Sequence, residues 1–242
     1  MSKKISLKQF LMKSGRFDRV EECIESIRAG KVTVSNKVIS NPNYFFNPKE
    51  LVKFGDEKMR KAPTLYFIMN KPAGYLSQKA ENEKTIYDLI NKLNIPEDQK
   101  KSLFAVGRLD KDTEGLMIIT NDGKLSDFIM APGNGIVKKY YAGLEKPASP
   151  TKLNMLRKGI EIEIDGEKHK TRNCKIKPVG EKEVYISLTE GKKRQIKKMF
   201  EAVGNKVVCL KRVSIGGLQL SDLKTGEMKT ITKEEIMEKL EF

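Results

Sequence analysis

The part of the sequence best suited to chemistry is a cluster of ionisable side chains between two apolar stretches. The cluster lies within residues 107–123 and contains Arg108, Asp110, Lys111, Asp112 and Glu114. We expect residues 103–106 to form a short buried strand, and residues 116–120 to form a second strand before a turn at residues 121–123. A polar loop held at both ends by buried strands can position reactive groups. The loop therefore predicts a site that uses carboxylate and cation chemistry.

Two other interpretations of this loop are open. The spacing of Asp110, Asp112 and Glu114 before Gly115 imitates the start of a calcium-binding loop. Asn121, however, occupies the position where such a loop needs a bidentate Glu. The charges could also belong to a solvated hairpin, because charge clusters usually face water.

The overall charge favours a polyanionic partner. Lys and Arg number 47 against 32 Asp and Glu, which gives a formal net charge of +15. Such a balance is typical of proteins that bind nucleic acid. A membrane is the other common polyanion, but no apolar stretch reaches the ~18 residues of a transmembrane helix, and no signal peptide opens the chain. We therefore expect a cytoplasmic protein with no membrane partner.

Cysteine and histidine usage removes several classes of site. Cys23, Cys174 and Cys209 are far apart, so neither a disulfide framework nor Cys-x-x-Cys metal spacing is present. The single histidine, His169, excludes most zinc sites and Ser–His–Asp catalysis. Any catalysis must then use carboxylate, Lys, Arg or Tyr, and we expect no metal site.

The first 60 or so residues predict a compact basic module. Ser6 is expected to cap one helix, and Asp18 with Glu21 to start a second that ends at Gly30. Val20, Ile24 and Ile27 should form the buried stripe of that second helix. Short strands then follow, and a charged linker is expected at residues 58–63. The module carries four cations that could contact RNA or merely solvate helix faces, namely Arg16, Arg19, Arg28 and Lys31.

The remainder of the chain alternates between predicted strands and helices. Residues 137–142 and 184–188 read as strands, and residues 160–170 as a hairpin turning at Asp165-Gly166. An amphipathic helix follows with Ile196, Met199, Phe200 and Val203 on its apolar stripe. Its opposite face is almost entirely cationic, and its candidate phosphate contacts are Lys193, Arg194 and Lys197.

The central loop resembles the catalytic signature of the RsuA/RluB/RluF group of rRNA pseudouridine synthases. The resemblance rests on Gly107-Arg108-Leu109-Asp110, Thr113, Gly115-Leu116 and Thr120-Asn121-Asp122-Gly123. In that family the Asp of Arg-Leu-Asp is the nucleophile, which implies this role for Asp110. Arg108 beside it would fill the gap left by a flipped base or grip a phosphate.

Two further segments carry the same resemblance. Lys138-x-Tyr140 is similar to the family's Lys-x-Tyr-x-Val motif, although Ala142 stands where Val is usual. The resemblance implies that Tyr140 lies over the target base. Glu190-Gly191-Lys192 is similar to the third motif, in which the first cation pairs with the catalytic carboxylate. That role maps onto Lys192.

The resemblance extends to the N-terminal module, which is similar to the alpha-L (S-four type) RNA-binding domain. It implies an α+β fold, with this domain at residues 1–61 and a catalytic domain at residues 62–242 around a large mixed, mostly antiparallel sheet flanked by helices. The implied reaction, isomerisation of uridine to pseudouridine, needs no cofactor. The expected partner is ribosomal RNA, with tRNA also possible in the family, and we expect a monomer with no obligate protein partner.

The sequence favours one rRNA subunit and leaves one other class of function open. Lys193-Arg194-Gln195 replaces the His-Gln that is usual in small-subunit enzymes, which favours a large-subunit substrate. A non-catalytic RNA-binding or ribosome-assembly protein could keep the same scaffold, provided that the Asp110 site is inert.

Overall fold

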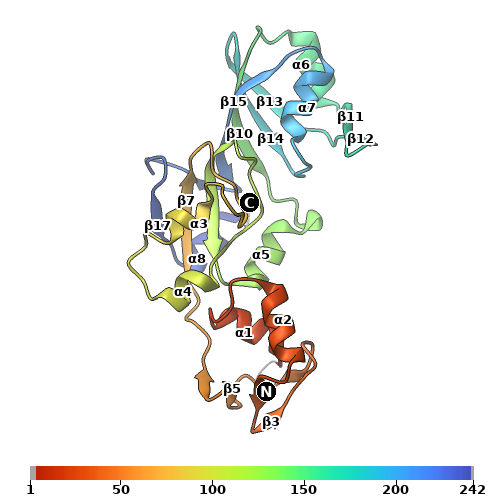
Figure 1. The fold of residues 1–242 in the computed structure, drawn as a ribbon. Helices are drawn as coiled ribbons and strands as arrows, with labels where there is room; N and C mark the ends of the chain where they lie inside the picture. The colour runs from red at the N-terminus through yellow and green to blue at the C-terminus, as the bar shows by residue number, and fades with distance from the viewer. Residues whose placement is uncertain (1–3, 241–242) are drawn as a thin grey trace. The chain divides into compact units, whose positions relative to one another are not determined.

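The computed structural model describes residues 4–240 of the chain, which divides into two compact units. The first unit is drawn from Met1–Leu65 and Asp88–Phe104, and the second from Tyr66–Tyr87 and Ala105–Phe242 (Figure 1). The first unit is therefore discontinuous in sequence, because residues 88–104 pack with the N-terminal residues. The continuous N-terminal part of this unit ends at Leu65, four residues after the boundary expected at residue 61.

Two short helices begin the first unit. Helix α1 spans Leu7–Lys13, and the Ser6 hydroxyl accepts a hydrogen bond from the backbone N–H of Gln9, as the sequence predicts for a cap. Helix α2 spans Val20–Arg28. The prediction that Val20 is buried is wrong, because this first residue of the helix is 41% exposed.

The strands of the first unit form two small sheets. The larger has the order β3-β2-β5-β6, and the smaller pairs β1 with β4. Their bounds are β1 Ile5–Ser6, β2 Val32–Val34, β3 Lys37–Val38, β4 Phe45–Phe46, β5 Val52–Phe54 and β6 Glu57–Met59. Strand β6 covers part of the segment expected to be a linker. Buried side chains from both helices and these strands make one core, with Leu11, Phe17, Ile27 and Val52 among its members. Helix α4, Glu97–Ser102, also belongs to this unit, and α3, Ile86–Ile90, lies at the boundary between the units.

The second unit is built on a nine-stranded sheet, which confirms the predicted large mixed sheet. Its main path is β13-β14-β10-β15-β9-β7-β17, with β16 paired to β15 and β8 paired to β9. Every pairing along the main path is antiparallel except that between β9 and β15. The bounds are β7 Tyr66–Lys71, β8 Phe104–Ala105, β9 Glu114–Thr120, β10 Lys138–Leu144, β13 Lys175–Gly180, β14 Glu183–Leu188, β15 Val207–Ile215, β16 Leu218–Gln219 and β17 Met228–Thr230.

A separate hairpin of two strands, β11 Glu161–Ile164 and β12 Glu167–Lys170, packs against helix α7. Its turn is the predicted one, with Asp165 and Gly166 both at positive φ. The helices of the second unit are α5 Gly123–Met130, α6 Pro150–Arg157, α7 Gln195–Ala202 and α8 Lys233–Leu240, with a 3-10 turn, η1, at Pro132–Asn134.

Side-chain hydrogen bonds cap the first turns of two of these helices, α5 and α8. Asp122 does not end a simple turn as predicted but caps α5, because its carboxylate accepts hydrogen bonds from the N–H groups of Lys124 and Leu125. Thr232 and Glu235, which have the spacing of a capping box, form one at the start of α8, with reciprocal bonds of 2.8 and 3.1 Å. Both helices bury an apolar stripe on the sheet.

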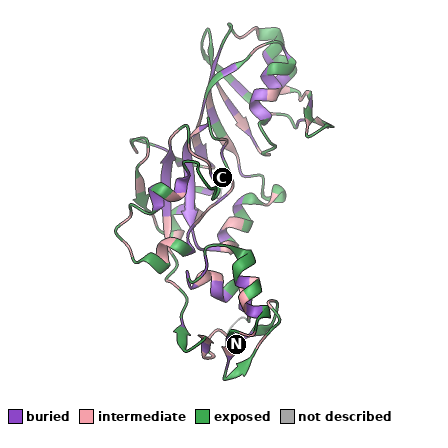
Figure 2. Ribbon diagram, viewed as in Figure 1, coloured by how far each residue is buried: buried purple, intermediate pink, exposed green. Residues whose placement is uncertain are grey.

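The core of the second unit lies between the sheet and these helices. Figure 2 shows that most of the central strands are buried, whereas loop and outer helix surfaces are exposed. One apolar cluster joins Ile68, Leu116 and Ile118 of the strands to Ile236 and Leu240 of α8. Strand β9, which follows the loop that contains Asp110, is thus buried in this core, as is its paired neighbour β7.

Candidate active site

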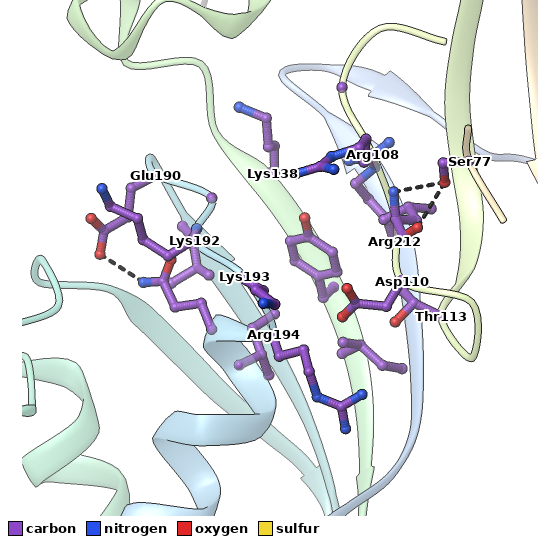
Figure 3. A pocket seen from close by; sticks show the side chains of 18 of the residues that line it. Ser77, Arg108, Asp110, Thr113, Lys138, Glu190, Lys192, Lys193, Arg194 and Arg212 are labelled. Atoms are coloured by element: carbon purple, nitrogen blue, oxygen red, sulfur yellow. Dashed lines mark hydrogen bonds between the residues drawn. The ribbon is translucent and has the colours of Figure 1, made fainter. Parts of the chain in front are cut away.

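A cleft of about 540 Å³ in the second unit contains the carboxylate singled out by sequence. Figure 3 shows Asp110, Thr113 and Arg212 on one side of it and Glu190, Lys192 and Arg194 on the other. The lining residues are 76–78, 107–111, 113, 130, 138, 140, 188, 190–196, 210 and 212. Segments that are far apart in sequence therefore meet around Asp110.

A buried lysine holds the Asp110 loop in place from behind. Lys71, the last residue of β7, is fully buried. Its ammonium group donates to the carbonyl oxygens of Asp110 at 3.1 Å, Lys111 at 3.3 Å and Thr113 at 2.8 Å, and to that of Pro72. Burial lowers the pKa of Lys71 to about 8, although the nearby carboxylates oppose this shift. Sequence reasoning did not assign this bonding role to Lys71, although the segment at residues 70–75 resembles a short motif of the pseudouridine synthases that could be structural or catalytic.

A serine fixes the other end of the loop. The buried Ser77 hydroxyl donates to the Leu109 carbonyl at 2.7 Å and accepts from the Leu109 N–H at 3.0 Å (Figure 3). Exposed Arg108 reaches Gln78 at 3.3 Å. Together with Lys71, Ser77 fixes the backbone on both sides of Asp110. The carboxylate is held on a rigid support, as a nucleophile requires.

The basic residue that pairs with the loop is not the one that sequence singled out. Lys197 of α7 is buried, and its ammonium lies 2.5 Å from the Asp112 carboxylate. Burial raises the pKa of Asp112, but the Lys197 ammonium outweighs it, so the pKa is lowered overall. We predicted that Lys197 contacts phosphate on an exposed face, whereas its position is that of a structural link between helix and loop.

The segment before α7 forms the opposite side of the cleft. The Glu190 carboxylate accepts from the Arg172 N–H at 2.8 Å and from the Gln195 side chain at 2.6 Å, and Gln195 in turn accepts from the Lys192 N–H at 3.0 Å. Arg194 adopts a left-handed backbone conformation with φ of 52°. These bonds hold a tight loop that carries Lys192, Lys193 and Arg194, all of them exposed.

The structure does not join Lys192 to Asp110. No ion pair links the two within residues 4–240, and Figure 3 shows them on opposite sides of the cleft. Lys193 instead pairs with Asp165 of the hairpin turn at 2.5 Å. Tyr140, 9% exposed, lines the cleft from β10, directly opposite Arg212 on β15. Asp110 and Tyr140 are thus brought to one cleft, whereas the Lys192 pairing stays a prediction without a contact to support it.

The predicted RNA-binding residues of the first unit are all on its surface. Arg16, Arg19, Arg28 and Lys31 are exposed. Arg16 stacks its guanidinium 4.8 Å from the centre of the Phe54 ring and lies 3.6 Å from Glu57. These positions allow contact with RNA.

The loop does not assemble a calcium site. In the described part of the chain no three His, Cys, Asp or Glu side chains gather as metal ligands would. Asp112 is turned toward Lys197.

Among residues 4–240, no helix combines the length and hydrophobicity that a bilayer crossing needs.

Comparison with known proteins defines the class. Residues 65–202 match the RNA pseudouridylate synthase family model. The chain is 35% identical to the Bacillus subtilis RNA pseudouridine synthase YtzG, with 95% of this chain and 96% of that protein covered. It is 34% identical to the ribosomal small subunit pseudouridine synthase A of Escherichia coli strain K12, covering 87% and 89%.

A solved structure shows the same fold along almost the whole chain. A crystal structure titled as a pseudouridylate synthase has a TM-score of 0.70 at 30% identity and covers 98% of this chain and 99% of its own. The chain therefore belongs to the RNA pseudouridylate synthase family. It is an RNA pseudouridine synthase, and Asp110 and Tyr140 line one cleft of its second unit.

Proposed function

We propose that this protein isomerises a uridine of ribosomal RNA to pseudouridine with Asp110 as the nucleophile. The observation that carries the proposal is the position of Asp110 in the cleft, on a loop whose backbone is fixed by Lys71 and Ser77. Asp110 is half-buried and has no cation within ion-pair distance among the described residues. Its carboxylate is therefore available to a substrate.

The proposed chemistry needs only groups that the cleft contains. The Asp110 carboxylate bonds to C1′ of the ribose as the bond from C1′ to N1 of uracil breaks. The released base turns, C5 bonds to C1′, and the carboxylate is freed. The proton lost from C5 is balanced by one gained at N1, so no oxidant, reductant or water is consumed. Covalent catalysis of this kind divides one difficult step into two easier ones.

Base flipping explains the other side chains that line the cleft. A uridine must leave its stack to reach Asp110, which costs a few kcal/mol. Stacking on an aromatic ring returns about 1 to 3 kcal/mol per base, and Tyr140 is the aromatic side chain in the lining. Exposed Arg108, two residues before Asp110, can occupy the vacated position or contact a phosphate.

The sequence motif and the comparison with a relative point to different rRNA subunits as the substrate. Lys193-Arg194-Gln195 favours the large subunit, whereas a relative at 34% identity is named for the small subunit. We therefore propose ribosomal RNA as the substrate class and expect one uridine in one subunit to depend on this protein. Action in the cytoplasm as a monomer, with the N-terminal module as an S-four type RNA-binding domain, completes the proposal.

The decisive experiment maps pseudouridine in both rRNAs. RNA from cells with the gene, without it, and with the Asp110→Asn variant is probed chemically at single-nucleotide resolution. We expect one uridine to lose its modification equally in the deletion and in Asp110→Asn. Glu83→Gln is the matched control, because it makes the same change of carboxylate to amide at an exposed residue that pairs with Lys111 of this loop. This control should keep most of the modification.

Two results would contradict the proposal. Full modification by Asp110→Asn would exclude Asp110 as the nucleophile. Unchanged rRNA in the deletion strain, with tRNA modification lost instead, would exclude ribosomal RNA as the substrate. If no RNA loses a pseudouridine, the alternative of a non-catalytic ribosome-assembly protein applies.

A further inference from the structure

A buried arginine in the cleft has a donor group that nothing in the described part of the protein accepts. Arg212 of β15 is 3% exposed yet lines the cleft. Its Nε donates to the Leu116 carbonyl at 2.7 Å, which fixes the guanidinium plane. Its Nη2 is buried and has no hydrogen-bond partner among residues 4–240. A buried unsatisfied donor is costly, and such exceptions call for an explanation.

A second cation lies near this guanidinium without a compensating carboxylate. Lys138 of β10 also lines the cleft and is only partly exposed. No acidic side chain pairs with it in the described part of the chain. Burial lowers the pKa of Lys138, and the positive charge of Arg212, which lines the same cleft, lowers it further.

The sheet geometry places both cations beside the aromatic ring of the cleft. Arg212 pairs directly across from Tyr140. Lys138 precedes Tyr140 by two residues on the same strand, so both side chains project from one face. The buried Thr113 hydroxyl, a further lining group, also lacks a partner among the described residues.

A purely structural role accounts for only part of this arrangement. The bond from Nε of Arg212 to Leu116 ties β15 to β9, but it leaves Nη2 and the Lys138 ammonium uncompensated. Two cations that line one cleft offer donors and positive charge for an anion. Phosphate is the fitting anion, because guanidinium groups match its oxygens and RNA supplies it.

We propose that Arg212 and Lys138 form a phosphate subsite that holds a backbone phosphate of the flipped nucleotide. The inference deepens the proposed function, on which its assignment to a nucleotide rests. Because Tyr140 is the cross-strand partner of Arg212 and lies two residues from Lys138, a phosphate held by the two cations keeps the attached ribose within the cleft that contains Asp110. The subsite would thus position the sugar, while Tyr140 positions the base.

The test measures anion binding directly, without catalysis. The melting temperature of the full chain is followed against inorganic phosphate, 5′-UMP, 3′-UMP and uridine at constant ionic strength, since a ligand of the native state raises it. Variants are Lys138→Met and Arg212→Lys. Lys139→Met and Lys211→Met are matched controls, because they remove the neighbouring charge on the same strands.

The quantity compared is the concentration of phosphate, or of one UMP isomer, that gives half of the full rise in melting temperature. In Lys138→Met we expect this concentration to rise about tenfold or more, because a charged hydrogen bond is lost. Arg212→Lys should fold, since it keeps the charge, and should show a similar rise because the fork of donors is lost. Lys139→Met and Lys211→Met should change the value less than about twofold. Uridine, which has no phosphate, should give little shift in any of these proteins.

Several outcomes would overturn the inference. Equal losses in Lys138→Met and Lys139→Met would show that phosphate responds only to net charge. A response to inorganic phosphate but to neither UMP isomer would exclude a nucleotide subsite. Asp110→Asn separates this result from the proposed function, because it should keep the phosphate response whether or not Asp110 is the nucleophile.

Discussion

The ammonium of Lys71 lies 3.1 Å from the backbone carbonyl of Asp110, although the two residues are 39 positions apart. Together with the bonds to the carbonyls of Lys111 and Thr113, this bond fixes the backbone of the Asp110 loop from a distant strand residue. The sequence of the loop itself gives no sign of this dependence. The cleft thus depends on a cation whose donors are directed at the protein's own backbone.

Replacing Lys71 with Met should lower both stability and activity. The carbonyl oxygens of the loop would lose their donor, and buried unsatisfied groups of this kind cost on the order of 2 kcal/mol. Urea unfolding measures the change. Lys111→Met is the control, because that exposed side chain pairs with exposed Glu83 at the surface, and it should change stability by less than about 0.5 kcal/mol. Equal losses of stability in the two variants would refute the conclusion that Lys71 stabilises the Asp110 loop.

The same lysine should give the reaction an alkaline limit. The folded-state pKa of about 8 lies below the value of about 10.4 for an unfolded lysine. As pH rises through 8, the ammonium loses a proton and can no longer donate to all its carbonyl partners, so single-turnover rates should fall. Between the two pKa values the unfolded state holds the proton that the folded state lacks, so the contribution of Lys71 to stability rises with pH over that window. A rate that stays level up to about pH 10 would count against this account.

Replacing Lys197 should lower the rate of modification, and replacing Lys192 should lower RNA affinity. The sequence motifs predict the reverse. Lys197→Met leaves Asp112 without its buried partner, so it should reduce the rate of modification and the stability together. Lys192→Met removes an exposed cation and should weaken RNA binding several-fold while sparing the rate at saturating RNA. Rates at saturating RNA, set beside affinities from titration, separate the two. A loss of rate confined to Lys192→Met would restore the original assignment.

The cations of the first unit should act on RNA affinity alone. Replacing Arg16, Arg19, Arg28 and Lys31 with Gln leaves the buried core of the unit intact. Affinity should fall, and the removal of each phosphate-binding cation should flatten the slope of log affinity against log salt by about 0.7 to 0.9. Filter binding at several salt concentrations measures the slope. The same slope in both proteins would mean that these side chains are merely solvated.

Gly115→Ala should prevent normal folding of the second unit. Gly115 has φ of +109°, and a Cβ there would lie 2.2 Å from the Arg212 carbonyl oxygen on the paired strand. No side-chain movement relieves a clash with backbone. Gly123→Ala is the matched control, since nothing lies within 4 Å of a Cβ at that position in the first turn of α5. Circular dichroism melts should show a large loss of stability for the first variant only.

Local signals in the sequence predicted much of the fold. The Ser6 cap, the Asp165-Gly166 turn and the Thr232–Glu235 box depend on residues at most three apart, so their chemistry can be read from the sequence alone. The apolar stripe of α7 follows the helical period in the same way. The motif around Asp110 located the cleft for a similar reason, because its spacing is local.

Contacts between distant residues could not be read this way. Lys197 looks like any cation on a polar helix face, since its burial depends on Asp112 in a loop 85 positions earlier. Lys71 and Arg212 likewise take their roles from partners 39 or more positions away. Strand β15 likewise carries Lys211 and Arg212 in its middle, and their places are set by pairing with β9 and β10.

The place of β15 in the sheet also sets the order in which the newly made chain can acquire its cleft. This strand lies between β10 and β9, and the bond from Arg212 to Leu116 joins residues 96 positions apart. Without β15, the path divides into β13-β14-β10 and β9-β7-β17, each antiparallel and each leading into part of the lining. Because translation adds β15 after all of these except β17, the emerging polypeptide has no complete RNA cleft until most of it has left the ribosome.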